Sequence, residues 1–204
     1  AFSMGCYYEM FLIFTQQKNQ AQAEEILLHI KRTMRGNVHH YSTYALDYSH
    51  ANLLDEATNF LSLALENPDD TDPMLYYYLG YFAHKQNKTD QARELCFKAT
   101  AMKPDYCFPN RIEDVNVLQF ATSVSKDPKA HYYLGNYWYA NRQHNEAIAQ
   151  WEASSSLDGQ FATVYRNLAL AYHNKKGDPS KALDALERAF AWDPNGARVL
   201  MEVD

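Results

Sequence analysis

The residues best suited to metal chemistry are eight histidines, of which His39, His40 and His50 form the densest group. A helical metal site favours two ligands four residues apart with further donors nearby. These three histidines lack that spacing, and no cysteine or carboxylate stands beside them. The three cysteines are odd in number and form no CxxC pair, so they predict neither a metal knuckle nor a disulfide framework. We expect no metal site.

Catalytic motifs are missing as well. The chain contains no GxxxxGK[ST], GxGxxG, GxSxG or HExxH pattern, and no nucleophile is paired with a base. We therefore expect a chain that is not an enzyme and holds no cofactor.

Charge and hydropathy remove two further classes of partner. The net charge is −6, and the largest basic cluster is Lys31-Arg32 with Arg35, so we expect no nucleic-acid partner. The longest apolar run covers residues 10–14, whereas a membrane-spanning helix needs about 20 apolar residues. The start of the chain does not look like a signal peptide. These features predict no membrane span and favour a cytoplasmic location.

Binding is the function class that remains, and tyrosine is the residue that suits it. The chain has 16 tyrosines. A tyrosine ring buries a large apolar area and leaves a hydroxyl for solvent or a partner, so it serves both helix seams and binding surfaces. The elements that position these rings follow from an internal repeat.

Alanines recur at a nearly constant interval along the chain. They are Ala23, Ala57, Ala92, Ala147 and Ala182, with gaps of 34, 35, 55 and 35 residues. Each opens the second helix of a predicted helix pair. Counting back 19 residues, or 20 in the last pair with its extra loop residue, gives the repeat starts Met4, Val38, Pro73, Pro128 and Ala162. We call the first helix of each pair helix A and the second helix B.

The repeat has a physical basis in helix pairing. A small residue at the eighth position of helix A, such as Gly135, and the alanine of helix B let two helices approach closely, while large residues such as Trp151 fill the seam. Asp72-Pro73, Asp127-Pro128 and Asp178-Pro179 each place a capping acceptor before a proline at the start of a helix. The chain resembles tetratricopeptide repeat (TPR) proteins over nearly its whole length. The resemblance implies an all-α, right-handed TPR superhelix.

The 55-residue gap interrupts the array. Residues 105–127 are too short for a helix pair, and their apolar spacing predicts an extended segment and a single odd helix over residues 111–123. We therefore divide the chain into three TPR-like pairs over 1–104, the odd segment over 105–127, and two TPR units over 128–204. Residues 197–201 are predicted to start a terminal helix.

The TPR resemblance also implies which residues line a concave binding groove. Positions 2, 5, 9 and 12 of helix A face that groove in the family. Here they include Tyr77, Tyr81, His84, Lys129, Tyr132, Asn136, Tyr139, Arg166, Leu170 and His173. Tyrosine-rich surfaces with polar anchors are typical of protein or peptide binding sites.

Some TPR domains hold the terminal carboxylate of a partner with a Lys, Asn and Arg clamp. Asn136 and Asn167 match two clamp positions, but Tyr132 replaces the lysine and Glu202 stands at the last arginine position. We therefore disfavour the clamp and retain Asn167 as a candidate binding residue. Of all these residues, Tyr132, Asn136 and Tyr139 are the strongest candidates, because the frame turns them away from Trp151.

A narrower resemblance concerns the back half of the chain. The series YCFPNR, VLQ, YYLGN and RNLALAY is similar to the C-terminal repeat region of a bacterial family with an N-terminal, β-rich domain linked to carbohydrate metabolism. Two hypotheses follow. The first is a protein- or peptide-binding scaffold that forms part of a larger protein. The alternative is an accessory helical segment packed against a carbohydrate-active domain of the same chain.

Overall fold

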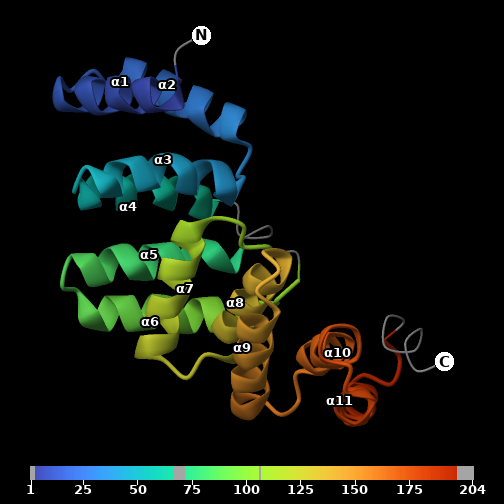
Figure 1. The fold of residues 1–204 in the computed structure, drawn as a ribbon. Coiled ribbons are helices and arrows are strands. Elements are labelled where there is room, and N and C mark those ends of the chain that lie inside the picture. The colour runs from blue at the N-terminus through green and yellow to red at the C-terminus, as the bar shows by residue number, and fades with distance from the viewer. Residues whose placement is uncertain (1–2, 67–71, 106, 197–204) are drawn as a thin grey trace. The chain divides into compact units, whose positions relative to one another are not determined.

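The computed structural model describes residues 3–66, 72–105 and 107–196 of the 204-residue chain, and these residues form helices and no strand (Figure 1). The elements are α1 (Met4–Gln16), α2 (Gln20–Met34), α3 (Val38–His50), α4 (Leu54–Ser62), η1 (Leu63–Glu66), α5 (Pro73–Lys85), α6 (Thr89–Ala101), α7 (Ile112–Val124), α8 (Pro128–Ala140), α9 (His144–Leu157), α10 (Ala162–Ala171), η3 (Tyr172–Lys176) and α11 (Pro179–Trp192). The predicted all-α fold class is confirmed, and the helices follow one another in pairs at the predicted TPR-like spacing.

The repeat frame fixes where the helices begin. The five helices A start at the predicted residues Met4, Val38, Pro73, Pro128 and Ala162. The odd helix predicted over 111–123 corresponds to α7, which spans Ile112–Val124. The predicted terminal helix over 197–201 lies outside the described residues, as does Tyr106 in the predicted extended segment.

Each of the five helix pairs turns through one residue with a left-handed backbone. These residues are Lys18, Asn52, Asn87, Arg142 and Gly177, with φ between 57° and 63°, and each precedes the repeat alanine by five positions. Arg35 and Gly36, with φ of 52° and 69°, lie instead between α2 and α3. The repeat is therefore visible in the backbone of its turns as well as in its sequence.

The predicted helix caps are present. The side chain of Asp72 accepts from the backbone N–H of Met74, and that of Asp178 accepts from Lys181 N–H. Asp127 caps α8 by accepting from the backbone N–H groups of Lys129 and Ala130. Each cap satisfies amide groups that the first turn of a helix leaves without partners.

The chain divides into two compact units, residues 1–99 and residues 100–204. We describe each unit by itself as unit 1 and unit 2. The predicted three-part division into 1–104, 105–127 and 128–204 stays a prediction.

The core of unit 1 is built on aromatic rings around Phe60 of α4. Its ring lies 4.6 Å from Tyr8, 5.5 Å from Tyr41 and 6.0 Å from Tyr44, measured between centroids. Burial, reinforced by nearby Glu56 and Glu9, raises the pKa of Tyr8 to about 12. Many of the 16 tyrosines therefore serve as core residues, as helix seams require.

The core of unit 2 is centred on α9 and α10. Ala147, Ile148 and Trp151 of α9 share a cluster of buried side chains with Val164 and Leu168 of α10. The extra residue of the last pair lies in a π-helical turn, η3, that continues α10, where we had predicted a longer loop. A π-turn closes its hydrogen bonds over one residue more than an α-turn, so it absorbs the insertion without breaking the helix.

Candidate functional site

The predicted groove residues of unit 1 differ in exposure. Tyr77 is 0% exposed, so the prediction that it lines a groove is wrong. The reason is that α3 and α4 both pack against α5, which leaves little of that helix accessible. Tyr81 is partly exposed beneath Lys85, whose Nζ lies 5.6 Å from the ring centroid, and His84 is exposed.

In unit 2, Lys129 is held by backbone rather than offered to a partner. Its Nζ donates to the carbonyl oxygen of Thr100 at 2.6 Å and to that of Met102. The Thr100 hydroxyl in turn donates to Asp127 at 2.6 Å. Burial lowers the pKa of Lys129, although Asp127 opposes this effect. Lys129 therefore ties residues 100–102 to the start of α8, and its predicted role as a groove residue is corrected.

The indole of Trp151 anchors a hydrogen-bonded network, which we call the Trp151 network. Its Nε1 donates to Asn136 Oδ1 at 3.2 Å and to the backbone oxygen of Tyr132 at 3.3 Å. The amide of Asn167 donates to the same Asn136 oxygen at 3.2 Å. The network thus joins helices α8, α9 and α10. The prediction that Asn136 faces away from Trp151 is wrong, because the indole donates a hydrogen bond to it across the seam.

The close approach predicted for Gly135 is present. A Cβ atom built on Gly135 would lie 2.3 Å from the Trp151 ring, so the indole packs directly on the glycine backbone. Trp151 is 3% exposed, as expected of a residue that fills the seam. The local sequence requirement is clear: a large ring on helix B needs a residue without a side chain on helix A.

Tyr132 and Arg166 lie at the edge of the Trp151 network, and both are partly exposed. The Tyr132 ring lies 4.9 Å from Phe161, and burial raises the pKa of its hydroxyl while a hydrogen bond with Asn136 lowers it. The Arg166 guanidinium donates to Asn167 Oδ1 at 3.5 Å. The structure therefore brings four predicted residues together, on facing surfaces of α8 and α10.

Tyr139 belongs to the core of its own helix pair. Its ring centroid lies 5.4 Å from Trp151 and 5.0 Å from His144, and Lys175 Nζ lies 6.0 Å away. The prediction that Tyr139 faces away from Trp151 is therefore wrong. Tyr139 packs against the Trp151 ring of helix B, so its side chain lies in the seam between the two helices.

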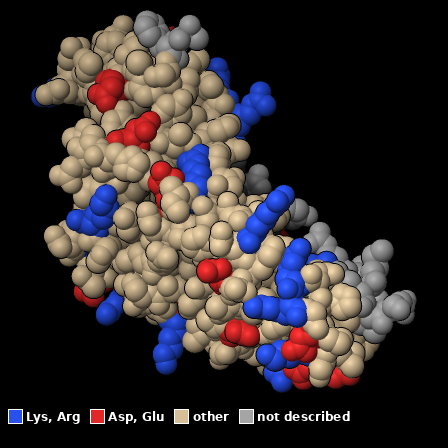
Figure 2. Space-filling view, viewed as in Figure 1, with Lys and Arg blue, Asp and Glu red and all other residues tan. Residues whose placement is uncertain are grey.

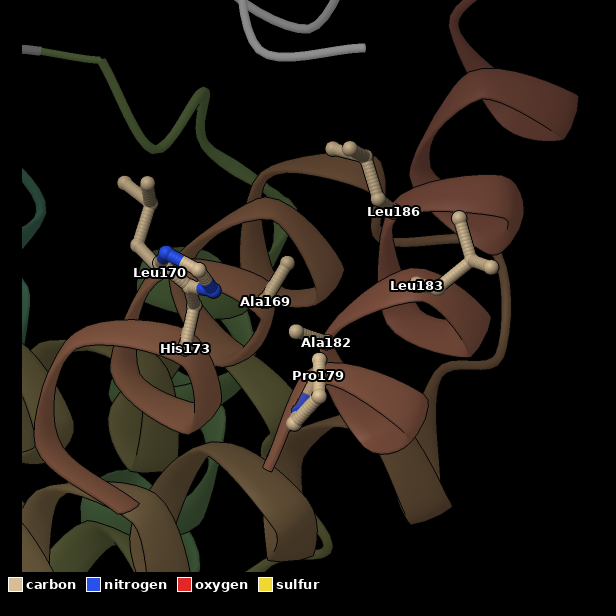
Figure 3. Close-up of a pocket in the computed structure, with 7 residues that line it drawn as sticks. All are labelled: Ala169, Leu170, His173, Pro179, Ala182, Leu183 and Leu186. Carbon is tan, nitrogen blue, oxygen red and sulfur yellow. The ribbon is translucent and has the colours of Figure 1, made fainter. Parts of the chain in front are cut away.

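Leu170 and His173 line a pocket between α10 and α11, with a volume of about 340 Å³ (Figure 3). The remaining lining residues are Ala169, Pro179, Ala182, Leu183 and Leu186. We call this space the α10–α11 pocket. Sequence reasoning missed its helix B residues, although Leu183 and Leu186 carry a signal: Leu186 stands where the preceding repeat has Trp151, and Leu183 places an apolar side chain on the surface of α11.

Charges of both signs are mixed on one face of the molecule. On the face that Figure 2 shows, Lys and Arg side chains are interspersed with Asp and Glu. In the described part of the chain, no group of three or more His, Cys, Asp or Glu residues is placed to hold a metal ion. None of the helices described is long and apolar enough to cross a membrane.

Comparisons with known proteins return solved structures of helical repeat proteins. No family model matches the chain. YrrB, described as a TPR protein with an unusual peptide-binding site, is 19% identical over 97% of this chain and 90% of its own, with a TM-score of 0.44. MamA is 19% identical over 91% and 95%, with a TM-score of 0.42. MamA from Desulfovibrio magneticus is 14% identical over 95% and 97%, with a TM-score of 0.40. The predicted carbohydrate-linked, β-rich domain stays a prediction.

Proposed function

We propose that the chain is a non-catalytic, protein-binding scaffold and that unit 2 binds a segment of a partner polypeptide across α8 and α10. The proposed contact surface is centred on Tyr132 and Arg166. The observation that carries the proposal is that these two residues are partly exposed and both are bonded to the Trp151 network, Tyr132 through its backbone oxygen and Arg166 through Asn167. The positive charge of Arg166 also lowers the pKa of the Tyr132 hydroxyl, against the larger effect of burial.

The chemistry of the two side chains suits recognition. Tyrosine and arginine are the residue types enriched among those that dominate binding energy at protein interfaces. The Tyr132 ring offers an apolar face with a hydroxyl, which can donate and accept hydrogen bonds. The Arg166 guanidinium presents several donors in a plane, which match carboxylate and backbone carbonyl acceptors of a polypeptide.

The support beneath the two side chains is rigid. Asn136 receives hydrogen bonds from Trp151 and Asn167, which come from different helices. A surface held in one conformation before binding loses less conformational entropy when a partner docks. The Trp151 network would therefore act on binding indirectly, by fixing α8 against α10.

A random peptide library selected against the intact chain tests this function. Dissociation constants of the selected peptides are then measured by fluorescence anisotropy for the wild type, Tyr132→Ala and Arg166→Glu. Loss of one such residue costs about 2 kcal/mol or more, so we expect at least roughly tenfold weaker binding.

Arg32→Glu is the matched control, because it makes the same charge reversal at an exposed residue of α2, in unit 1. Circular dichroism checks that each variant is folded. Peptides that bind all four proteins equally, or a library that yields no binder, would contradict the proposal.

A further inference from the structure

The α10–α11 pocket has an internal counterpart in the preceding helix pair. A shift of 34 residues in helix A and 35 in helix B relates the two pairs. The counterparts of the seven lining residues are Gly135, Asn136, Tyr139, His144, Ala147, Ile148 and Trp151. Unit 2 therefore contains the same site twice.

In the α8–α9 pair this site is filled from within. The indole of Trp151 lies on Gly135, bonds to Asn136 at 3.2 Å, and faces the Tyr139 ring at 5.4 Å between centroids. His144 completes the site at 5.0 Å from Tyr139. The site thus holds a planar aromatic group on a floor of small residues.

In the α10–α11 pair three changes alter the same site. Leu186 replaces the tryptophan, His173 replaces Tyr139, and Leu170 replaces Asn136. The smaller side chains at positions 186 and 173 leave a volume of about 340 Å³, and the change at position 170 exchanges a polar side chain for an apolar one. Figure 3 shows Leu170 and His173 on one side, Leu183 and Leu186 on the other, and the small residues Ala169 and Ala182 between them.

The outer side of the pocket is also open, and it continues an established interface. In the preceding pair, α10 covers Ile148 of α9, which is 5% exposed and belongs to the shared core. The counterpart of Ile148 is Leu183, which is 59% exposed. Leu183 is thus an exposed apolar side chain at a position that α10 covers in the preceding repeat. A partner could make the contact there that α10 makes with Ile148.

We propose that the α10–α11 pocket binds an aromatic side chain, an indole or a phenol ring, presented by a partner polypeptide. The ring would lie on Ala169 and Ala182, as the Trp151 indole lies on Gly135 one repeat earlier. Leu183 and Leu186 supply apolar contact, and the His173 ring supplies an edge that can stack or exchange a hydrogen bond. The inference does not rest on the Tyr132–Arg166 surface and extends the chain's binding capacity to a second site.

The probe for this site is N-acetyl-tryptophanamide, titrated into the chain labelled for NMR at leucine methyl and histidine ring positions. We expect weak, saturable shifts at Leu170, Leu183, Leu186 and His173. N-acetyl-leucinamide should bind at least threefold more weakly, since an aliphatic group fills a flat slot less well.

The matched variant transfers the α8–α9 arrangement into the last pair. The double substitution Ala169→Gly and Leu186→Trp places an indole and its glycine where Trp151 and Gly135 stand one repeat earlier. The new indole should fill the pocket and weaken probe binding at least tenfold while circular dichroism stays unchanged.

Should the double variant not fold, Leu183→Ser changes an exposed side chain and should weaken probe binding several-fold. Its control is Leu28→Ser, because Leu28 of α2 is also exposed, at 47%. This variant should bind the probe as the wild type does.

Four outcomes would overturn the proposal. The first is probe shifts elsewhere or none, and the second is equal binding by the wild type and the folded double variant. The third is binding that appears only after residues 197–204 are deleted, which would make the chain's own end the occupant. The fourth is pocket shifts that depend on protein concentration without probe, which would make a second copy the occupant.

Discussion

The helix pairs α8–α9 and α10–α11 follow one repeat frame, yet they use the space between their helices in different ways. The first pair closes its seam with Trp151 lying on Gly135, and the second leaves a pocket of about 340 Å³ beside Leu186. The difference shows that equivalent positions of one repeat frame can hold an internal ring in one pair and leave an opening in the next. We propose that the first pair supports the Tyr132–Arg166 surface and that the second presents a separate binding site.

The largest effect should come from removing the ring that fills the first seam. Trp151→Ala deletes a side chain that is 3% exposed together with its two hydrogen bonds. We expect a loss of roughly 3–5 kcal/mol in the free energy of unfolding, measured with urea. Leu186→Ala at the partly exposed counterpart should cost only about 1–2 kcal/mol, and equal losses would contradict the distinction between the two seams.

A second prediction tests the close approach itself. Gly135→Ala places a methyl group 2.3 Å from the Trp151 ring, so the indole must shift, at a cost of roughly 1–3 kcal/mol. The reverse change at the counterpart, Ala169→Gly, should cost about 1 kcal/mol or less, because it removes only helix propensity and a small contact. Thermal or urea unfolding of the two variants measures both. A Gly135→Ala variant as stable as the wild type would contradict the claim that Trp151 packs too closely on residue 135 to leave room for a side chain.

A third prediction concerns the polar part of the first seam. Asn136→Leu introduces the residue found at the counterpart position 170 and leaves Asn167 without its acceptor. We expect a loss of about 1–2 kcal/mol in the free energy of unfolding. The pKa of Tyr132 should also rise further, because the hydrogen bond from Asn136 lowers it. An ultraviolet titration of the phenol, with Tyr132→Phe to assign its signal, would detect that rise, and a fall in pKa would contradict the network.

The smallest effect should appear in the turns of the two pairs. Gly177 and Arg142 occupy equivalent left-handed positions, with φ of 63° and 61°. Gly177→Ala should destabilise the chain by about 1 kcal/mol, because a Cβ atom is strained in this conformation. Arg142→Gly should change stability by less than about 0.5 kcal/mol, since relief of strain offsets the added freedom of the unfolded chain. Melting temperatures rank the two variants, and the opposite order would indicate that the turns are not equivalent.

The helix array could be predicted from sequence because its signals are local. Asp-Pro pairs fix where α5, α8 and α11 begin, and the spacing of the alanines fixes the pairing of helices A and B. The π-turn at Tyr172–Lys176 was harder, because an added residue is compatible with either a longer loop or a widened helix turn. The choice depends on packing against α11.

The candidate site could be predicted only in part, because exposure depends on neighbours that are distant in sequence. Tyr77 and Tyr132 occupy the same frame position, yet only Tyr77 is wholly buried. Asn136 and Tyr139 appear solvent-facing in a helix projection but are drawn inward by the size of Trp151. The sequence does indicate the α10–α11 pocket, because Leu186 stands where the preceding repeat has Trp151.

The central claim, that a partner polypeptide binds across α8 and α10 of unit 2, is tested most directly by hydrogen–deuterium exchange on the intact chain with and without a library-selected peptide. We predict slower amide exchange in α8 and α10 on adding the peptide, with unit 1 unchanged. The same peptide should leave exchange in Arg166→Glu unaltered. Protection confined to unit 1, or to α9 alone, would contradict the account.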